Sequence, residues 1–104
     1  MDAIDPPAIQ CSVDAEHQRD HVSLRGRIVG ASAASGSYRL EIQSQSPSGR
    51  SMVTQAGQFK SEADEPVFVG AAHLSMAAGT RLVARLSVHV DQLSCNAERE
   101  ISDE

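Results

Sequence analysis

The chain has 104 residues, enough for one domain and no more. It carries 9 Lys and Arg residues against 14 Asp and Glu, a net charge of −5, and no basic run occurs. Nucleic-acid binding and docking on an anionic membrane are therefore not expected, because both depend on clustered cations. No segment approaches the roughly 20 consecutive apolar residues that a membrane-spanning helix needs.

The two ends of the chain differ in composition from its middle. The start, residues 1–8, is acidic and proline-containing, and it lacks the basic and apolar regions of a signal peptide. We expect a flexible leader at residues 1–8, a domain at residues 9–97 and a flexible acidic tail at residues 98–104. The lack of a signal peptide fits either a cytosolic protein or the mature form of a secreted one.

The first half of the chain alternates apolar and polar residues with a period of two, which indicates strands. This alternation predicts strands over residues 9–15, 21–30 and 37–46, with a polar turn at 16–20 and a small-residue loop at 31–36. A turn is predicted next, because Pro47 presets φ and Gly49 allows a positive φ.

The second half starts with weaker signals and ends with stronger ones. Residues 51–55 predict a short edge strand, and Phe59 is the one large apolar residue of a polar stretch. Pro66 opens a predicted strand that runs to Leu74. Proline is tolerated at the first position of a strand, because it removes no ladder hydrogen bond there. Turns at 77–79 and 91–92 precede two further predicted strands, at 81–90 and 93–97.

Seven short strands at spacings near ten residues are typical of a sandwich of two sheets. The sequence therefore predicts an all-β fold, a seven-stranded immunoglobulin-like β-sandwich. A small open barrel is the competing fold, and the pattern alone does not exclude it. Aliphatic side chains must fill the core, because the chain has two Phe, one Tyr and no Trp.

Two cysteines, Cys11 and Cys95, lie near opposite ends of the chain. Their spacing excludes a Cys-x-x-Cys redox pair, and two thiols without nearby histidines make a poor zinc site. Both fall on the inward parity of their strands, so we predict a disulfide worth roughly 4–5 kcal/mol between the first and last strands. A disulfide implies an oxidising compartment. A cytosolic domain with two free thiols is the alternative.

No pattern in the sequence points to catalysis, a cofactor or a metal. Four histidines are scattered over predicted turns and outward positions: His17, His21, His73 and His89. No Gly-x-Ser-x-Gly elbow and no Gly-rich phosphate loop occurs, and the acidic residues of the 62–65 loop are those of a solvated turn. We therefore predict that the protein is not an enzyme, needs no cofactor and holds no metal.

Outward-facing arginines are the more informative polar residues. Arg39 lies on the third predicted strand, and Arg81 and Arg85 lie on the sixth. These strands are neighbours in a sandwich of this type, so the three guanidinium groups are expected to share one exposed face. Arg25 and Arg27 form a smaller group on the opposite sheet. The ordinary interpretation is that such residues keep sheet faces solvated and discourage edge pairing.

Several short segments, in this order and spacing, resemble one family over most of the chain, roughly residues 9–97. They are Gly36-Ser37-Tyr38-Arg39-Leu40, Ser46-Pro47-Ser48-Gly49-Arg50-Ser51, Gln55-Ala56-Gly57-Gln58-Phe59, Ala84-Arg85-Leu86-Ser87-Val88, and the early Cys11 and late Cys95. The chain is similar to the curli assembly inhibitor family of the CsgH type. The related CsgC type carries a Cys-x-Cys pair that this sequence lacks, so a thiol-exchange role does not carry over.

The resemblance implies an immunoglobulin-like sandwich in the periplasm. It also implies a partner, the curli major subunit, which the protein would keep from polymerising into amyloid before export. Contact could be electrostatic, or an edge such as residues 51–55 could add a strand of the client. Our hypothesis for the client-binding residues is the face formed by Arg39, Arg81 and Arg85. We expect a monomer.

Two other functions remain open from the sequence. One is a generic secreted β-sandwich module, such as an adhesin or an accessory domain, that binds a folded partner without anti-amyloid activity. The other is a metal-binding envelope protein that uses its histidines.

Overall fold

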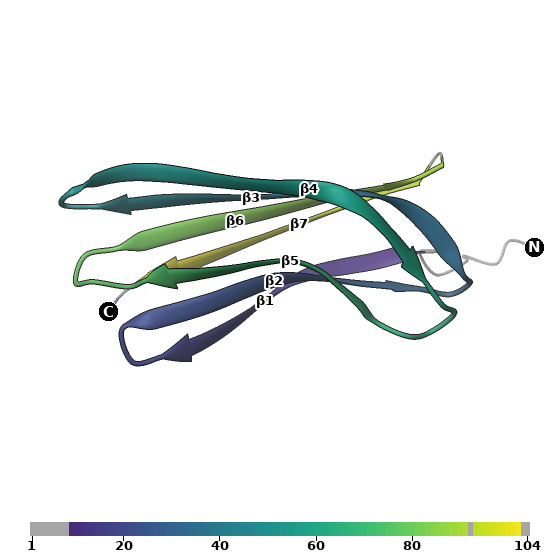
Figure 1. Cartoon of the computed structure of the whole chain (residues 1–104), viewed down its shortest axis with the longest axis horizontal. Helices are drawn as coiled ribbons and strands as arrows, with labels where there is room; N and C mark the ends of the chain where they lie inside the picture. Colours follow the sequence, from purple (N-terminus) through teal and green to yellow (C-terminus); the bar gives the residue numbers. More distant parts are fainter. Residues whose placement is uncertain (1–8, 92, 103–104) are drawn as a thin grey trace, which may run out of the picture.

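The computed structural model describes residues 9–91 and 93–102 as seven strands in two antiparallel sheets. The strands are β1 (Ile9–Gln18), β2 (His21–Gly30), β3 (Ala34–Ser46), β4 (Gly49–Ser61), β5 (Val67–Ser75), β6 (Arg81–Val90) and β7 (Leu93–Ser102). One sheet has the order β1-β2-β5 and the other the order β4-β3-β6-β7. Figure 1 shows them as two layers, with the chain crossing from β4 into β5 at one end. The predicted all-β, immunoglobulin-like sandwich is confirmed.

The core between the sheets is almost entirely aliphatic. In β6 the alternate residues Leu82, Ala84, Leu86 and Val88 are at most 1% exposed, because the strand turns every second side chain inward. They pack beside Leu40 and Ile42 of β3 in the same sheet and against equally buried residues of β2 in the facing sheet, namely Val22, Leu24 and Ile28. This alternation explains why period-two patterning located the strands. No helix able to cross a membrane occurs among residues 9–91 and 93–102.

Three hairpins have two-residue turns and fix the registers of the sheets. Gln18 pairs with His21, Ser46 with Gly49, and Val90 with Leu93. The register between β3 and β4 is unbroken over the whole length of both strands. The β2–β5 register shifts once, between Leu24 and Gly26, which marks a β-bulge.

Some strands are longer than the sequence predicted. β1 continues to Gln18, β3 begins at Ala34 inside the predicted small-residue loop, and β4 covers residues 49–61 where only 51–55 was expected. Phe59 belongs to β4 and lies in the core, at 7% exposed. Apart from Phe59, these extensions consist of small or polar residues without a clear alternation, and pairing with the neighbouring strand makes them extended.

The predicted flexible tail at residues 98–104 is wrong for residues 98–102, which belong to β7. Ile101 pairs with Leu82 and is 7% exposed, so burial of one apolar side chain holds the end of the strand. The polar residues around it concealed this strand in the sequence. The predicted leader at residues 1–8, residue 92 of the last turn and residues 103–104 lie outside the described residues.

Candidate functional site

The three arginines singled out in the sequence lie on one face of the four-stranded sheet. Arg39 of β3 pairs in register with Ser87 of β6, two residues along from Arg85, and Arg81 pairs with Gln45 of β3. All three occupy positions that point away from the core, and their side chains are 54–61% exposed. We call the outward side of β4-β3-β6-β7 the outer face.

Each of these arginines has a glutamate partner on the same face. The Nε of Arg81 lies 2.6 Å from Glu100 Oε2, and the Nε of Arg85 lies 3.3 Å from Glu98 Oε2. Arg39 Nη2 lies 3.7 Å from Glu41 Oε2. The pairs of Arg81 and Arg85 are exposed on both sides, whereas Glu41 is half-buried. Exposed pairs contribute about 0–1 kcal/mol, so the guanidinium groups of Arg81 and Arg85 can exchange their partners at little cost. The outer face therefore carries arginines that the strands hold in place and whose guanidinium groups can bind a new partner.

The sequence analysis missed the partners of Arg81 and Arg85, because it expected Glu98 and Glu100 in a flexible tail. Cross-strand pairing of β6 with β7 places Glu98 opposite Arg85 and Glu100 opposite Val83. A sequence signal did exist, since Ile101 continues the alternation of Leu93, Cys95 and Ala97. Because of this pairing, the positive and negative charges on the β6–β7 part of the outer face balance each other.

The other part of the outer face, over β3 and β4, has an excess of positive charge. Arg50 and Lys60 of β4 have no carboxylate partner among residues 9–91 and 93–102, and no Asp or Glu occurs between residues 49 and 61. Apart from the Arg39–Glu41 pair of β3, the rest of the surface there is uncharged. Its outward side chains are Ser37, Gln43 and Gln45 of β3 and Met52, Thr54, Ala56 and Gln58 of β4.

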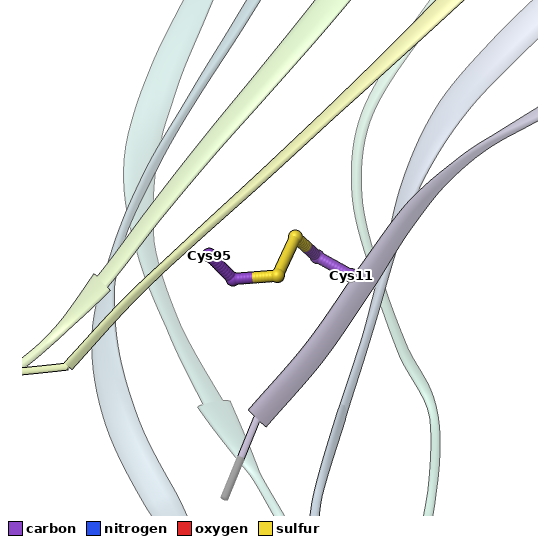
Figure 2. Close-up of a disulfide and its surroundings, with 2 residues drawn as sticks. All are labelled: Cys11 and Cys95. Atoms are coloured by element: carbon purple, nitrogen blue, oxygen red, sulfur yellow. A yellow bond between two sulfur atoms is a disulfide. The ribbon is translucent and has the colours of Figure 1, made fainter. Parts of the chain in front are cut away.

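On one side of the sandwich, which we call the closed side, β1 and β7 are linked between the sheets. The predicted disulfide is present there: Cys11 and Cys95 are bonded, with their Cα atoms 6.1 Å apart (Figure 2). Further along, Arg99 Nη1 of β7 donates a hydrogen bond of 3.2 Å to the carbonyl oxygen of Val13 in β1. Both cysteines of the chain are used, so it has no free thiol.

On the opposite side, which we call the open side, β4 and β5 are linked by one side chain. The amide of Gln55 receives a 2.8 Å hydrogen bond from Ala71 N and donates one of 2.7 Å to Ala71 O. The bulge makes this possible, because Gly70 and Ala71 together oppose Arg25 of β2, and Gly70 adopts a φ of +70°. The Gln55 amide thus takes the place of a peptide group of a neighbouring strand.

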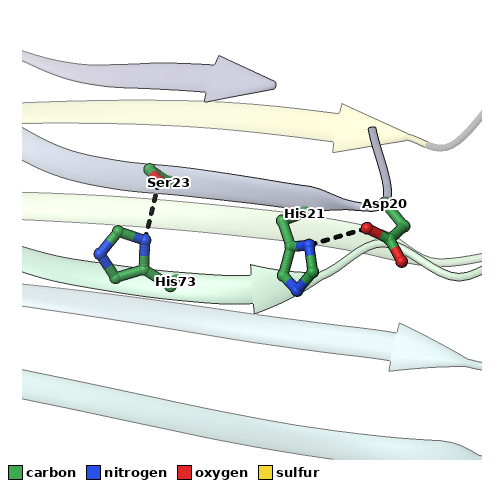
Figure 3. A network of polar contacts seen from close by, with 4 residues as sticks. All are labelled: Asp20, His21, Ser23 and His73. Carbon is green, nitrogen blue, oxygen red and sulfur yellow. Dashed lines mark hydrogen bonds and ion pairs between the residues drawn. The ribbon is translucent and has the colours of Figure 1, made fainter. Parts of the chain in front are cut away.

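Two of the histidines, His21 and His73, make separate polar contacts, as Figure 3 shows. His73 Nδ1 lies 2.8 Å from Ser23 Oγ, and His21 Nδ1 lies 2.8 Å from Asp20 Oδ1. Within residues 9–91 and 93–102 no group of three or more His, Cys, Asp or Glu side chains could hold a metal ion. This arrangement gives a metal-binding function no support.

The smaller arginine group on the three-stranded sheet has a different environment. Arg25 lies over the ring of Phe68, 3.8 Å from its centroid, and its Nε is 4.0 Å from Asp14 Oδ2. A stacked guanidinium is less available to a partner than one held only by an exposed carboxylate. Arg25 and Arg27 therefore provide a natural control for the outer face.

Comparisons with known proteins agree with this architecture. The model of the CsgH protein family matches residues 10–100. The solution structure of R. palustris CsgH is similar, with 32% identity, a TM-score of 0.75, and coverage of 86% of this chain and 89% of that one. The E. coli curli protein CsgC shares the fold at 15% identity, with a TM-score of 0.77 and coverage of 86% and 96%. A search of curated proteins found no match.

Proposed function

This chain belongs to the CsgH family and is therefore a curli-related protein, and from that premise we propose that it is a periplasmic, chaperone-like inhibitor. Its task would be to prevent premature amyloid polymerisation of the secreted curli subunit. The disulfide supports an oxidising compartment such as the periplasm.

The observation that carries the proposal is the outer face with its exchangeable arginines. Arg39, Arg81 and Arg85 are fixed on neighbouring strands of one sheet; Arg81 and Arg85 are held by exposed glutamates, and Arg39 by the half-buried Glu41. A client that brings its own carboxylates or carbonyls can replace those partners. Because such contacts act mainly on encounter and specificity, they suit brief engagement of a rare early species better than permanent binding.

The scaffold also suits the task, because an inhibitor of amyloid must not join the fibril. Unpaired strand edges are the sites at which amyloid grows. On the closed side, the disulfide and the Arg99 hydrogen bond hold β1 and β7 against each other. On the open side, Gln55 covers the backbone of Ala71. A face can therefore meet the client while the edges of β1, β7 and β5 stay occupied.

A thioflavin-T time course of a purified curli major subunit, with this protein far below equimolar amounts, tests the proposal. We expect a lengthened lag with the natural sequence and loss of that effect in Arg39→Glu/Arg81→Glu/Arg85→Glu. The matched control is Arg19→Glu/Arg25→Glu/Arg27→Glu, which makes the same change in net charge away from the outer face and should still lengthen the lag. Circular dichroism confirms that both variants are folded.

Two outcomes would count against the proposal. An unchanged lag with the folded natural protein would favour a secreted β-sandwich binding module without anti-amyloid activity. Equal loss of inhibition in both triple variants would mean that net charge matters and that the Arg39, Arg81 and Arg85 face is not the binding surface.

A further inference from the structure

We infer that the edge of β4, from Arg50 to Gln58, takes up one extended, acidic segment of the client as an additional strand of the sheet. The inference rests on the proposed function, because it identifies how that client is held. It also explains inhibition, since a strand bound to this edge meets a sheet that cannot extend on its far side.

A sandwich of two open sheets has four edge strands, and here they are β1, β5, β4 and β7. On the closed side, the Cys11–Cys95 disulfide ties β1 to β7, and Arg99 occupies the Val13 carbonyl. β5 is interrupted by the bulge at Gly70 and Ala71, and Gln55 caps it there. Each of these three edges thus carries a feature that opposes strand addition.

β4 carries no such feature in its first ten residues. It pairs with β3 without a shift over all 13 residues, and it contains no proline. Ser46 and Gly49 flank a two-residue turn and so form a hydrogen-bonded pair, from which the ladder alternates. The N–H and C=O groups of the even-numbered residues from Arg50 to Gln58 therefore point away from β3. None of them has a backbone partner in the described chain.

The charge of β4 identifies the kind of strand that fits. Arg50 and Lys60 are exposed at its two ends, and no acidic residue lies between them. The intervening outward side chains are uncharged, and Met52 is 55% exposed. An extended segment with carboxylates near its ends would meet both cations, while uncharged polar or small side chains would suffice in its middle.

A second copy of this chain fits the edge less well than an acidic client. Full-length antiparallel pairing of two β4 strands would place Arg50 of each copy opposite Lys60 of the other. Like charges directly opposite each other destabilise a strand pair. The same two residues that attract an acidic segment therefore oppose self-association at this edge.

Addition at β4 would block strand growth on one side of the client strand, because the sheet of this protein offers no second usable edge beyond it. Amyloid extends when each added strand offers a fresh edge to the next one. The far strand of this sheet is β7, which is bonded to β1 of the other sheet. A client strand bound to β4 consequently has one edge covered by a surface that does not propagate the ladder.

Proline substitution at a residue with an outward N–H tests the inference. Thr54→Pro removes a donor that faces the client and leaves the β3 ladder intact, so the fold should persist. We expect that about ten times more of the Thr54→Pro variant than of the natural protein is needed for the same lag. This factor corresponds to the loss of a hydrogen bond worth about 1 kcal/mol or slightly more. Asn96→Pro is the matched control, because Asn96 has the same outward parity on β7 and should act like the natural protein.

Amide hydrogen exchange of the natural protein gives an independent test that needs no variant. With the curli subunit added, the amides of Met52, Thr54 and Ala56 should exchange about tenfold more slowly, while Val53 and Gln55, already bonded to β3, should hardly change. Three results would overturn the inference. They are unaltered inhibition by folded Thr54→Pro, no protection of the even-numbered amides during inhibition, and protection that rises with the concentration of this protein alone. If the natural protein does not lengthen the lag at all, the proposed function itself fails.

Discussion

The two sides of the sandwich link the edge strands of the two sheets with different chemistry. On the closed side, β1 and β7 are joined by a covalent bond and a charged side chain that reaches a backbone carbonyl. On the open side, β4 and β5 meet through the amide of Gln55, which bonds both backbone groups of one residue. The closed side is fixed by two links, at Cys11 and Val13 of β1, whereas the open side is fixed by one side chain. This difference leaves the first part of β4 available to a partner.

The largest expected effect comes from opening the closed side. The disulfide links residues separated by 84 positions, so its loss in Cys11→Ala/Cys95→Ala should lower the free energy of unfolding by about 4–5 kcal/mol. Urea unfolding with and without reductant measures this loss in the free energy of unfolding. The natural protein under reductant should match the double variant. A loss below about 1 kcal/mol would mean that non-covalent packing alone holds the closed side.

A smaller effect is expected on the open side. Gln55→Ala removes two hydrogen bonds and should lower the free energy of unfolding by about 1–3 kcal/mol. Gln55→Glu is the matched control, because it keeps the acceptor for Ala71 N and loses only the donor. Exchange of the Ala71 amide should accelerate in the alanine variant and much less in the glutamate variant. Equal acceleration in both would show that Gln55 does not hold this edge through the Ala71 N–H.

The smallest expected effect is that of Arg99. Arg99→Met keeps much of the apolar stem and removes the single hydrogen bond to Val13, so we expect a loss of about 1 kcal/mol or slightly more in urea unfolding. The same substitution in the Cys11→Ala/Cys95→Ala background tests whether the two links are coupled. A loss there as large as that of the disulfide would contradict the view that the covalent link dominates the closed side.

The sequence predicted β2 and β6 with their observed bounds, because both strands alternate strongly over their full length. It missed the start of β3, the second half of β4 and the end of β7. Those stretches contain residues such as Ser35 and Gln58, whose extended conformation comes from pairing with a neighbour. Local alternation can locate a strand whose own side chains fill the core, but it cannot locate one that is extended mainly by its partner.

In the candidate site, too, some features could be predicted from local alternation and others depend on cross-strand pairing. The parity of Arg39, Arg81 and Arg85 could be taken from the alternation of their strands, and the structure places them on one face. Their glutamate partners and the Gln55 contact depend on cross-strand register and on a bulge at Gly70. A register is a property of two distant segments together, and no short motif in either segment specifies it.

The most direct test of amyloid inhibition is the thioflavin-T lag of the curli major subunit, measured with the oxidised natural protein far below equimolar amounts. We predict a lag that lengthens steeply with small additions, because only a few early client species have to be bound. The control is the same amount of an unrelated disulfide-bonded β-sandwich, which should leave the lag unchanged. An unchanged lag with folded, oxidised protein would contradict the claim that this member of the CsgH family inhibits amyloid polymerisation.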